Sequence, residues 1–92
     1  MTPIEHAKNL GPTTGAELRS VGIATLEQLR ELGWEEVWYR LCEAYPHRSH
    51  SMCGYALMGA EQGIRLEELT ADEKSYVKRV AARLKQQGSQ NA

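Results

Sequence analysis

Residues 9–29 read NLGPTTGAELRSVGIATLEQL, and this stretch decides the fold. Gly11 can adopt the left-handed or close-approach backbone that a residue with a β-carbon resists. Pro12 suits the first turn of a helix, because that turn leaves its amides without acceptors. Leu10 is an apolar side chain placed to be buried just before the turn. The stretch therefore predicts a tight turn that feeds a helix over residues 12–20.

The start of this helix is a candidate phosphate site. The first amides of a helix have no partners within it, and the aligned peptide dipoles place positive charge there. Contacts of this kind are largely independent of base sequence and weaken as salt rises. We therefore expect DNA phosphates to be bound by four backbone amides, with the two threonine hydroxyls assisting: Leu10, Gly11, Thr13 and Thr14.

Two more helices are expected in the next 25 residues. Thr25, with Gln28 three residues later, predicts a capping box and a second helix that stops near Gly33. A third helix should end at Tyr45-Pro46, since a run of mainly apolar residues falls at the spacing that only a helix brings onto one face: Trp34, Val37, Trp38, Leu41, Cys42 and Tyr45. Such a stripe is far more typical of a core than of a surface that stacks on bases.

Small residues favour a closely packed fourth helix between Ser51 and Gly63, and the sequence over 70–73 predicts a capping box that starts a last helix. No strand pattern and no internal repeat is present. The predicted fold class is all-α, a compact bundle of about five short helices. We expect a short N-terminal segment over residues 1–8, a helical domain over 9–87 and a disordered polar tail over 88–92.

The charge of the chain argues against strong non-specific DNA binding. The 92 residues carry a formal net charge of −1 and a predicted pI near 6.3, far from the basic balance of domains that hold DNA by bulk electrostatics. From residue 70 onward, however, cations outnumber Asp72 and Glu73, and these cations form a candidate basic ridge for phosphate or an acidic partner: Lys74, Lys78, Arg79, Arg83 and Lys85. They also simply suit the C-terminal half of a solvated helix.

Metal binding and catalysis are not indicated. Four residues of types that bind zinc form a C-x4-H-x2-H-x2-C series: Cys42, His47, His50 and Cys53. The spacing is not a common zinc pattern, and Cys42 belongs to the apolar stripe. No nucleophile, phosphate-loop or dinucleotide motif is present. We expect a non-enzymatic protein that uses no metal, no cofactor and no small-molecule substrate.

The expected location is the cytoplasm. Residues 1–6 have neither the charged start nor the apolar run of a signal peptide, and two cysteines are too few for a disulfide framework. No stretch has the apolar length that is needed to span a bilayer.

The chain resembles the C-terminal domain of the TfoX (Sxy) family of competence regulators over roughly residues 9–85. The match is carried by Asn9-Leu10-Gly11-Pro12 with Leu18, Val21-Gly22-Ile23-x-Thr25-Leu26-x-x-Leu29, Tyr39-Arg40-Leu41, Tyr55-Ala56-Leu57-x-Gly59-Ala60 and Gly63-x5-Leu69. The corner is also similar to one in the α chain of RNA polymerase, in its C-terminal domain, which touches DNA and activators. The resemblance implies a helix-hairpin-helix-like N-terminal half and a regulatory role in competence or transcription.

The chain departs from DNA-binding helix-hairpin-helix motifs at two positions. Asn9 stands where the first glycine of Gly-hydrophobic-Gly is usual, and Thr13 stands where a Lys or Arg often follows. Asn tolerates the left-handed conformation, but one phosphate-pairing charge is lost. Weak DNA binding is therefore expected, and the alternative is a protein-protein interaction module that binds no DNA and docks on a transcription regulator or on a second copy of itself.

Overall fold

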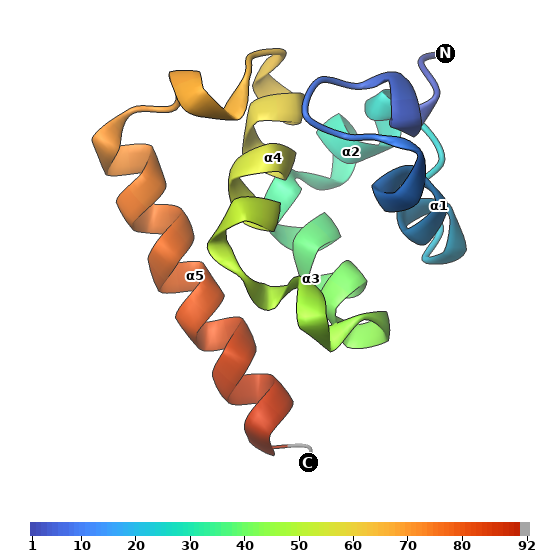
Figure 1. The fold of residues 1–92 in the computed structure, drawn as a ribbon. Helices are drawn as coiled ribbons and strands as arrows, with labels where there is room; N and C mark the ends of the chain where they lie inside the picture. Colours follow the sequence, from blue (N-terminus) through green and yellow to red (C-terminus); the bar gives the residue numbers. More distant parts are fainter. Residues whose placement is uncertain (91–92) are drawn as a thin grey trace.

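A computed structural model describes residues 1–90, of which 87–90 are described by their backbone alone. Five α-helices and three short 3-10 helices make up this part of the chain (Figure 1). Their bounds are η1 (Ile4–His6), α1 (Pro12–Ser20), α2 (Leu26–Leu32), α3 (Trp34–Ala44), η2 (Pro46–Ser49), α4 (Ser51–Gln62), η3 (Leu66–Glu68) and α5 (Ala71–Gln90). The all-α prediction is confirmed.

The helix boundaries follow local signals in the sequence. Thr25 and Gln28 form the predicted capping box, in which the Gln28 amide donates to the Thr25 hydroxyl at 3.1 Å. Thr70 caps α5 in the same way through the Glu73 amide, at 3.1 Å. Gly63 ends α4 in the left-handed conformation, with φ of 76°. These caps confirm the helix starts and stops that the sequence predicts for α2, α4 and α5.

The N-terminal segment packs onto the helices that follow it. Its backbone runs beside the start of α2, where the Ile4 amide donates to the Ala24 carbonyl at 3.0 Å and the Leu26 amide donates to the Thr2 carbonyl at 2.9 Å. The Ile4 side chain is fully buried. Residues 1–8 therefore belong to the same packed unit as α1 and α2.

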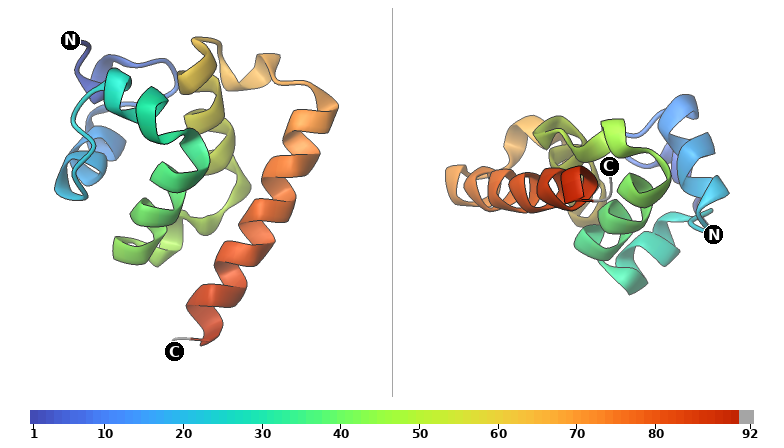
Figure 2. Two further views of the ribbon diagram at one scale, coloured as in Figure 1. Left: turned by 180° about the vertical axis from the view of Figure 1, so that it is seen from behind. Right: turned by 90° about the horizontal axis from the view of Figure 1, so that it is seen from below.

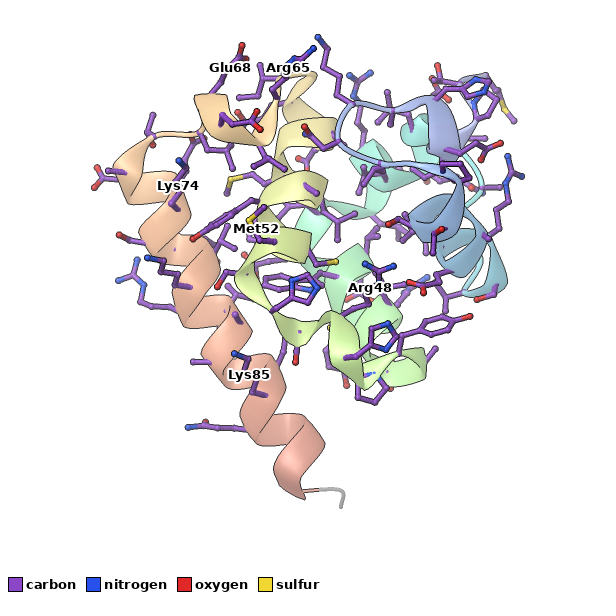
Figure 3. The ribbon with its side chains drawn as sticks, in the orientation of Figure 1. Arg48, Met52, Arg65, Glu68, Lys74 and Lys85 are labelled. Atoms are coloured by element: carbon purple, nitrogen blue, oxygen red, sulfur yellow. The ribbon has the colours of Figure 1, made fainter. Side chains whose placement is uncertain are left out.

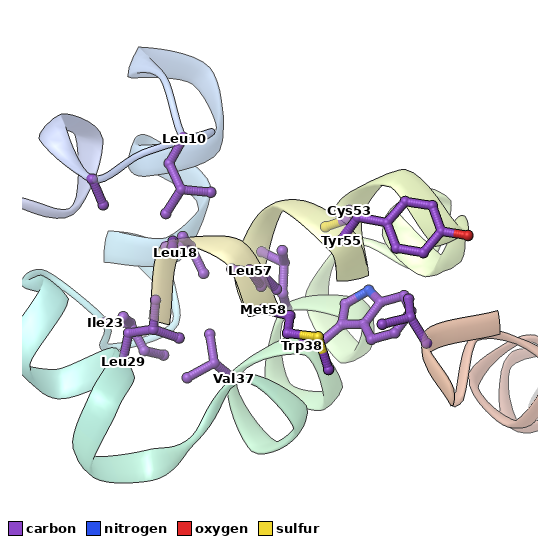
Figure 4. Close-up of a cluster of buried hydrophobic side chains, with 14 of the residues drawn as sticks. Leu10, Leu18, Ile23, Leu29, Val37, Trp38, Cys53, Tyr55, Leu57 and Met58 are labelled. Carbon is purple, nitrogen blue, oxygen red and sulfur yellow. The ribbon is translucent and has the colours of Figure 1, made fainter. Parts of the chain in front are cut away.

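The core lies between α3, α4 and the elements on either side of them (Figure 4). In α3 the stripe predicted from the sequence is confirmed, since Val37, Trp38 and Leu41 are fully buried. Gly54 of α4 faces this stripe, and a β-carbon at Gly54 would lie 2.5 Å from the Trp38 ring and 2.6 Å from Val77 of α5. The lack of a side chain at Gly54 therefore lets α4 pack between α3 and α5.

Helix α5 lies along one side of the molecule, and α1 lies on the other side (Figures 1 and 2). The buried face of α5 consists of four side chains that are less than a tenth exposed: Val77, Val80, Ala81 and Leu84. The helix continues to Gln90, and residues 91–92 of the predicted tail lie outside the described residues. No described helix combines the length and the apolar character that crossing a membrane requires.

Candidate nucleic-acid interface

The corner before α1 is built around a left-handed asparagine. Asn9 has φ of 71°, and it is the one non-glycine residue with positive φ in the described chain. Gly11 is extended, with φ of −128° and ψ of −170°, and a β-carbon there would meet nothing within 4 Å. The special backbone expected of Gly11 is therefore found at Asn9, because the chain turns three residues before α1 begins at Pro12.

The Asn9 side chain ties the corner to the end of α4. Its Nδ2 donates to the Ile64 carbonyl at 2.9 Å and to the Ala56 carbonyl at 3.4 Å, and its Oδ1 accepts from the Leu66 amide at 3.0 Å. A β-carbon at Gly59 would lie 2.5 Å from Asn9 Nδ2. The corner is therefore fixed against α4 by hydrogen bonds that only an amide side chain can make all at once.

The first amides of α1 differ in their availability. The Leu10 amide donates to the Ala7 carbonyl at 3.2 Å and Leu10 itself is buried, so this predicted phosphate contact is already engaged within the chain. The amides of Gly11, Thr13 and Thr14 have no acceptor among the residues that the structure describes, and no side chain caps the helix. Three of the four predicted amides are therefore free to bind a ligand.

The other four α-helices of residues 1–90 each have a side-chain acceptor at the N-terminus. Thr25 and Thr70 cap α2 and α5. In α3 the Trp34 amide donates to a carboxylate oxygen of Glu61 at 2.7 Å, and in α4 the Cys53 amide donates to Nδ1 of His50 at 3.3 Å. Within the described chain, α1 is the α-helix whose first amides have no side-chain acceptor.

Acidic and basic side chains both lie near the N-terminus of α1, but the nearest acidic ones form ion pairs with arginines. Glu5 accepts from Arg19 at 2.8 Å, and Glu17 accepts from Arg48 at 2.6 Å. The Arg19 hydrogen bond also lowers the pKa of Glu5. Lys8 precedes Asn9, Arg65 precedes the Leu66 amide that Asn9 accepts from, and both are exposed without an ion pair among the described residues. Two cations therefore adjoin the corner, of which Arg65 is labelled in Figure 3.

The predicted basic ridge on α5 divides into two faces. At 3.6 residues per turn, Lys74, Lys78 and Lys85 fall on one side of the helix, and Lys85 is near enough to His50 to help lower its pKa. Arg79 lies on the other side, 5.8 Å from the centre of the Tyr76 ring, and Arg83 lies beside the same tyrosine. Neither face adjoins α1, so the corner and the ridge are separate surfaces (Figures 1 and 3).

The series of possible zinc ligands has other roles in the structure. His50 uses Nδ1 as the helix cap, and burial raises the pKa of Cys42 to about 11 and that of Cys53 to about 12. Both thiols are therefore protonated at neutral pH, whereas zinc binds the thiolate. Among residues 1–90 no three His, Cys, Asp or Glu side chains gather in a group that could hold a metal ion.

Three structural contacts were not foreseen from the sequence: the Asn9 tie, the Glu61 cap of α3 and the role of Arg48. Arg48 pairs with Glu17, and its carbonyl accepts from the Trp38 ring N–H at 2.8 Å. A buried tryptophan does require an acceptor, but that requirement alone does not name the residue that supplies it.

The described residues form a small all-helical domain in which the first amides of α1 have no side-chain acceptor. The chain belongs to the TfoX C-terminal domain family, which matches residues 1–81. This is a regulatory type of domain family and not a known enzyme family. The chain is also similar to the crystal structure of an uncharacterized protein from Listeria monocytogenes, with a TM-score of 0.85 and 29% identity over 90% of this chain and 93% of that chain. No curated protein matches the sequence.

Proposed function

We propose that this protein is a non-enzymatic regulatory binding module, in competence or transcription, that holds the DNA backbone weakly and without regard to base sequence. The observation that carries the proposal is the uncapped N-terminus of α1. Its free amides at Gly11, Thr13 and Thr14 are held in place by the Asn9 tie. A preorganised set of amides at the positive end of a helix suits a phosphate group.

The strength of binding follows from the charges. Lys8 and Arg65 are the cations that adjoin the corner, and the net charge of −1 adds no general attraction. Each phosphate that a protein neutralises contributes about −0.9 to the slope of log affinity against log salt. A slope of about −2 is therefore expected, much shallower than that of a basic DNA-binding domain.

The test is an amide NMR titration with a short DNA duplex of arbitrary sequence, at low and at physiological salt. The amides of residues 11–14 are expected to shift most, and less so at the higher salt. A double variant, Thr13→Glu with Thr14→Glu, should abolish the shifts. Glutamates in the first turn favour the helix through its dipole, so the fold is preserved while phosphate is repelled.

The control for charge is Ala44→Glu, which adds one negative charge, against two in the double variant, at an exposed position at the far end of α3. It should leave the titration nearly unchanged, which separates a local contact from an effect of net charge. A wild-type spectrum that does not respond to DNA at low salt would contradict the proposal. So would equal losses of binding in the glutamate variants and in the control.

A second candidate function, protein interaction without DNA binding, has an observation of its own. Tyr39 of α3 and Tyr76 of α5 are 40% and 37% exposed, although both are large apolar side chains. They lie on the side of α5 that carries Arg79 and Arg83. If DNA leaves the spectrum unchanged, this surface is the place to look for a protein partner.

A further inference from the structure

A shallow groove runs between α3 and α5, at a distance from the corner of α1. It is lined by Glu35 and Tyr39 from α3 and by Val80, Arg83 and Leu84 from α5. Val80 and Leu84 form an apolar floor, since both are less than a tenth exposed. Tyr39 lines the groove beside this floor and is 40% exposed, so most of the apolar surface that the groove presents to solvent belongs to Tyr39.

Aromatic side chains pack beside the groove and hold Glu35, one of its lining residues. Trp34 and Tyr76 stack edge to face with ring centres 5.9 Å apart, and the Tyr76 hydroxyl donates to the Glu35 carboxylate. Trp34 also stacks on the buried Trp38, at 6.0 Å. A partner that docks here therefore meets a surface that is already ordered, which lowers the entropy cost of binding.

The two walls of the groove carry opposite charge. Glu35 lies on the α3 side, and its neighbour Glu36 is neutralised by Arg40 at 2.8 Å. Arg79 and Arg83 lie on the α5 side, and neither is paired with a carboxylate in the part of the chain that the structure describes. Such a surface complements itself, because a twofold axis along the groove sets the α3 wall of one copy against the α5 wall of the other.

We propose that this groove is the contact between two copies of the chain. Glu35 of each copy then faces Arg83 of the other, and the two Tyr39 side chains pack over the apolar floors. The proposal does not depend on DNA binding, because the corner of α1 lies on another surface.

The size of the groove sets the expected affinity. The 11 residues of α3 extend for about 16 Å, and two packed helices span about 20 Å, so each copy offers roughly 300 Å². Contacts of this size belong to the small, transient class of interfaces. We therefore expect a dissociation constant of roughly 100 µM, and dimers only at high protein concentration.

The test is sedimentation velocity of the full chain without DNA, over a concentration series that reaches the millimolar range. Wild-type protein should pass from monomer to dimer. Tyr39→Ala should weaken the association about tenfold, because it removes the central exposed contact. The matched control is Met52→Ala, which truncates a 55% exposed apolar side chain on α4 and should leave the association unchanged.

Two charge variants distinguish this contact from any other. In the proposed dimer, Glu35→Arg sets an arginine opposite Arg83 and Arg83→Glu sets a carboxylate opposite Glu35, so each variant should be monomeric alone, and an equimolar mixture of the two should dimerise. Thermal melts of each variant check that it is folded. A wild-type chain that stays monomeric at millimolar concentration would overturn the proposal, as would equal effects of the Tyr39 and Met52 substitutions or a mixture that stays monomeric.

Discussion

Single side chains carry much of the specificity of this small fold. Asn9 is the clearest case, because one amide group satisfies two carbonyls and one backbone amide of a distant turn while its own backbone is left-handed. His50 is another, since its ring nitrogen accepts from an amide of α4 and so replaces the Ser, Thr or Asp usual at a helix start. Both roles depend on the chemistry of a particular atom, and substitutions test them directly.

Substitutions at Asn9 should separate its backbone role from its side-chain role. Asn9→Gly keeps the left-handed backbone but leaves three partly buried polar groups without a partner, at an expected cost of about 2 kcal/mol. Asn9→Ala adds the strain of a left-handed alanine, about 1 kcal/mol more. The free energy of unfolding in urea measures both. A glycine variant as stable as the wild type would show that the hydrogen bonds contribute nothing.

His50 should make stability depend on pH. Burial, and the charges of Arg48, His47 and Lys85, lower the pKa of His50 in the folded protein below its ordinary value of about 6.5. The unfolded state therefore binds the proton more readily. The stability that the neutral cap contributes is complete above about pH 6.5 and is lost as the pH falls through that value towards the folded-state pKa.

The measurement is urea unfolding at a series of pH values between 7.5 and 5, compared with His50→Asn. Asparagine caps a helix without titrating, so this variant should lose less stability as the pH falls than the wild type does. His6→Asn makes the same change at an exposed histidine of η1 that is not among the groups acting on His50, and it should keep the wild-type slope. Equal slopes for the wild type and for His50→Asn would contradict the proposed cap.

At the scale of the elements, close approach decides where the helices lie. Because Gly54 has no side chain, Trp38 and Val77 can pack against the surface of α4. Gly59 leaves room for the Asn9 side chain in the same way, one and a half turns later. Both contacts put a neighbouring element where a larger side chain would stand. The spacing of small residues in the sequence predicts such contacts, and the structure shows which residues make them.

Two glycine substitutions should have opposite outcomes. Gly59→Ala sets a β-carbon 2.5 Å from Asn9 Nδ2 and 2.9 Å from the Ile64 carbonyl, so a loss of about 1–3 kcal/mol is expected. Gly11→Ala meets open space on extended backbone and should change the stability by less than about 1 kcal/mol. Thermal or urea unfolding checks both. A destabilised Gly11→Ala variant would mean that the corner needs glycine itself.

Local sequence signals predicted the elements well, and contacts distant in sequence were not predictable from them. Thr25 and Thr70 predict where α2 and α5 begin, because each capping residue and its partner lie three residues apart in the sequence. Asn9 and Leu66 lie 57 residues apart, and no local rule links them. The start of α1, where the phosphate site is proposed, was predicted correctly, but the engaged amide of Leu10 depends on how the preceding turn folds back on Ala7.

At the scale of the whole molecule, polar contacts join α1 to η2 and to the end of α3. Glu17 of α1 pairs with Arg48 of η2 at 2.6 Å, where the two side chains are only 16% and 19% exposed. Tyr45 adds a hydroxyl contact with Ser20 at 2.9 Å. The orientation of α1, and with it the direction in which its free amides point, is therefore set in part by this ion pair.

A double-mutant cycle should measure this junction. Glu17→Gln and Arg48→Met are each expected to destabilise the fold, and the coupling energy between them should be about 1 kcal/mol, at the upper end for ion pairs because solvent screens this one poorly. The control pair is Glu36 and Arg40 within α3, which is well exposed and should couple by about 0.4 kcal/mol. Equal coupling in the two cycles would contradict a special role for the junction.

The Asn9 tie also bears on the order in which the molecule folds. It closes stretches of 47 to 57 residues, and a contact of that separation forms only after much chain entropy has been lost. We therefore expect the helices α3 and α4 to assemble first and the corner to dock late. In stopped-flow experiments, Asn9→Gly should then leave the refolding rate almost unchanged and speed unfolding. The asparagine governs how long the molecule stays folded, while the speed of folding is set elsewhere.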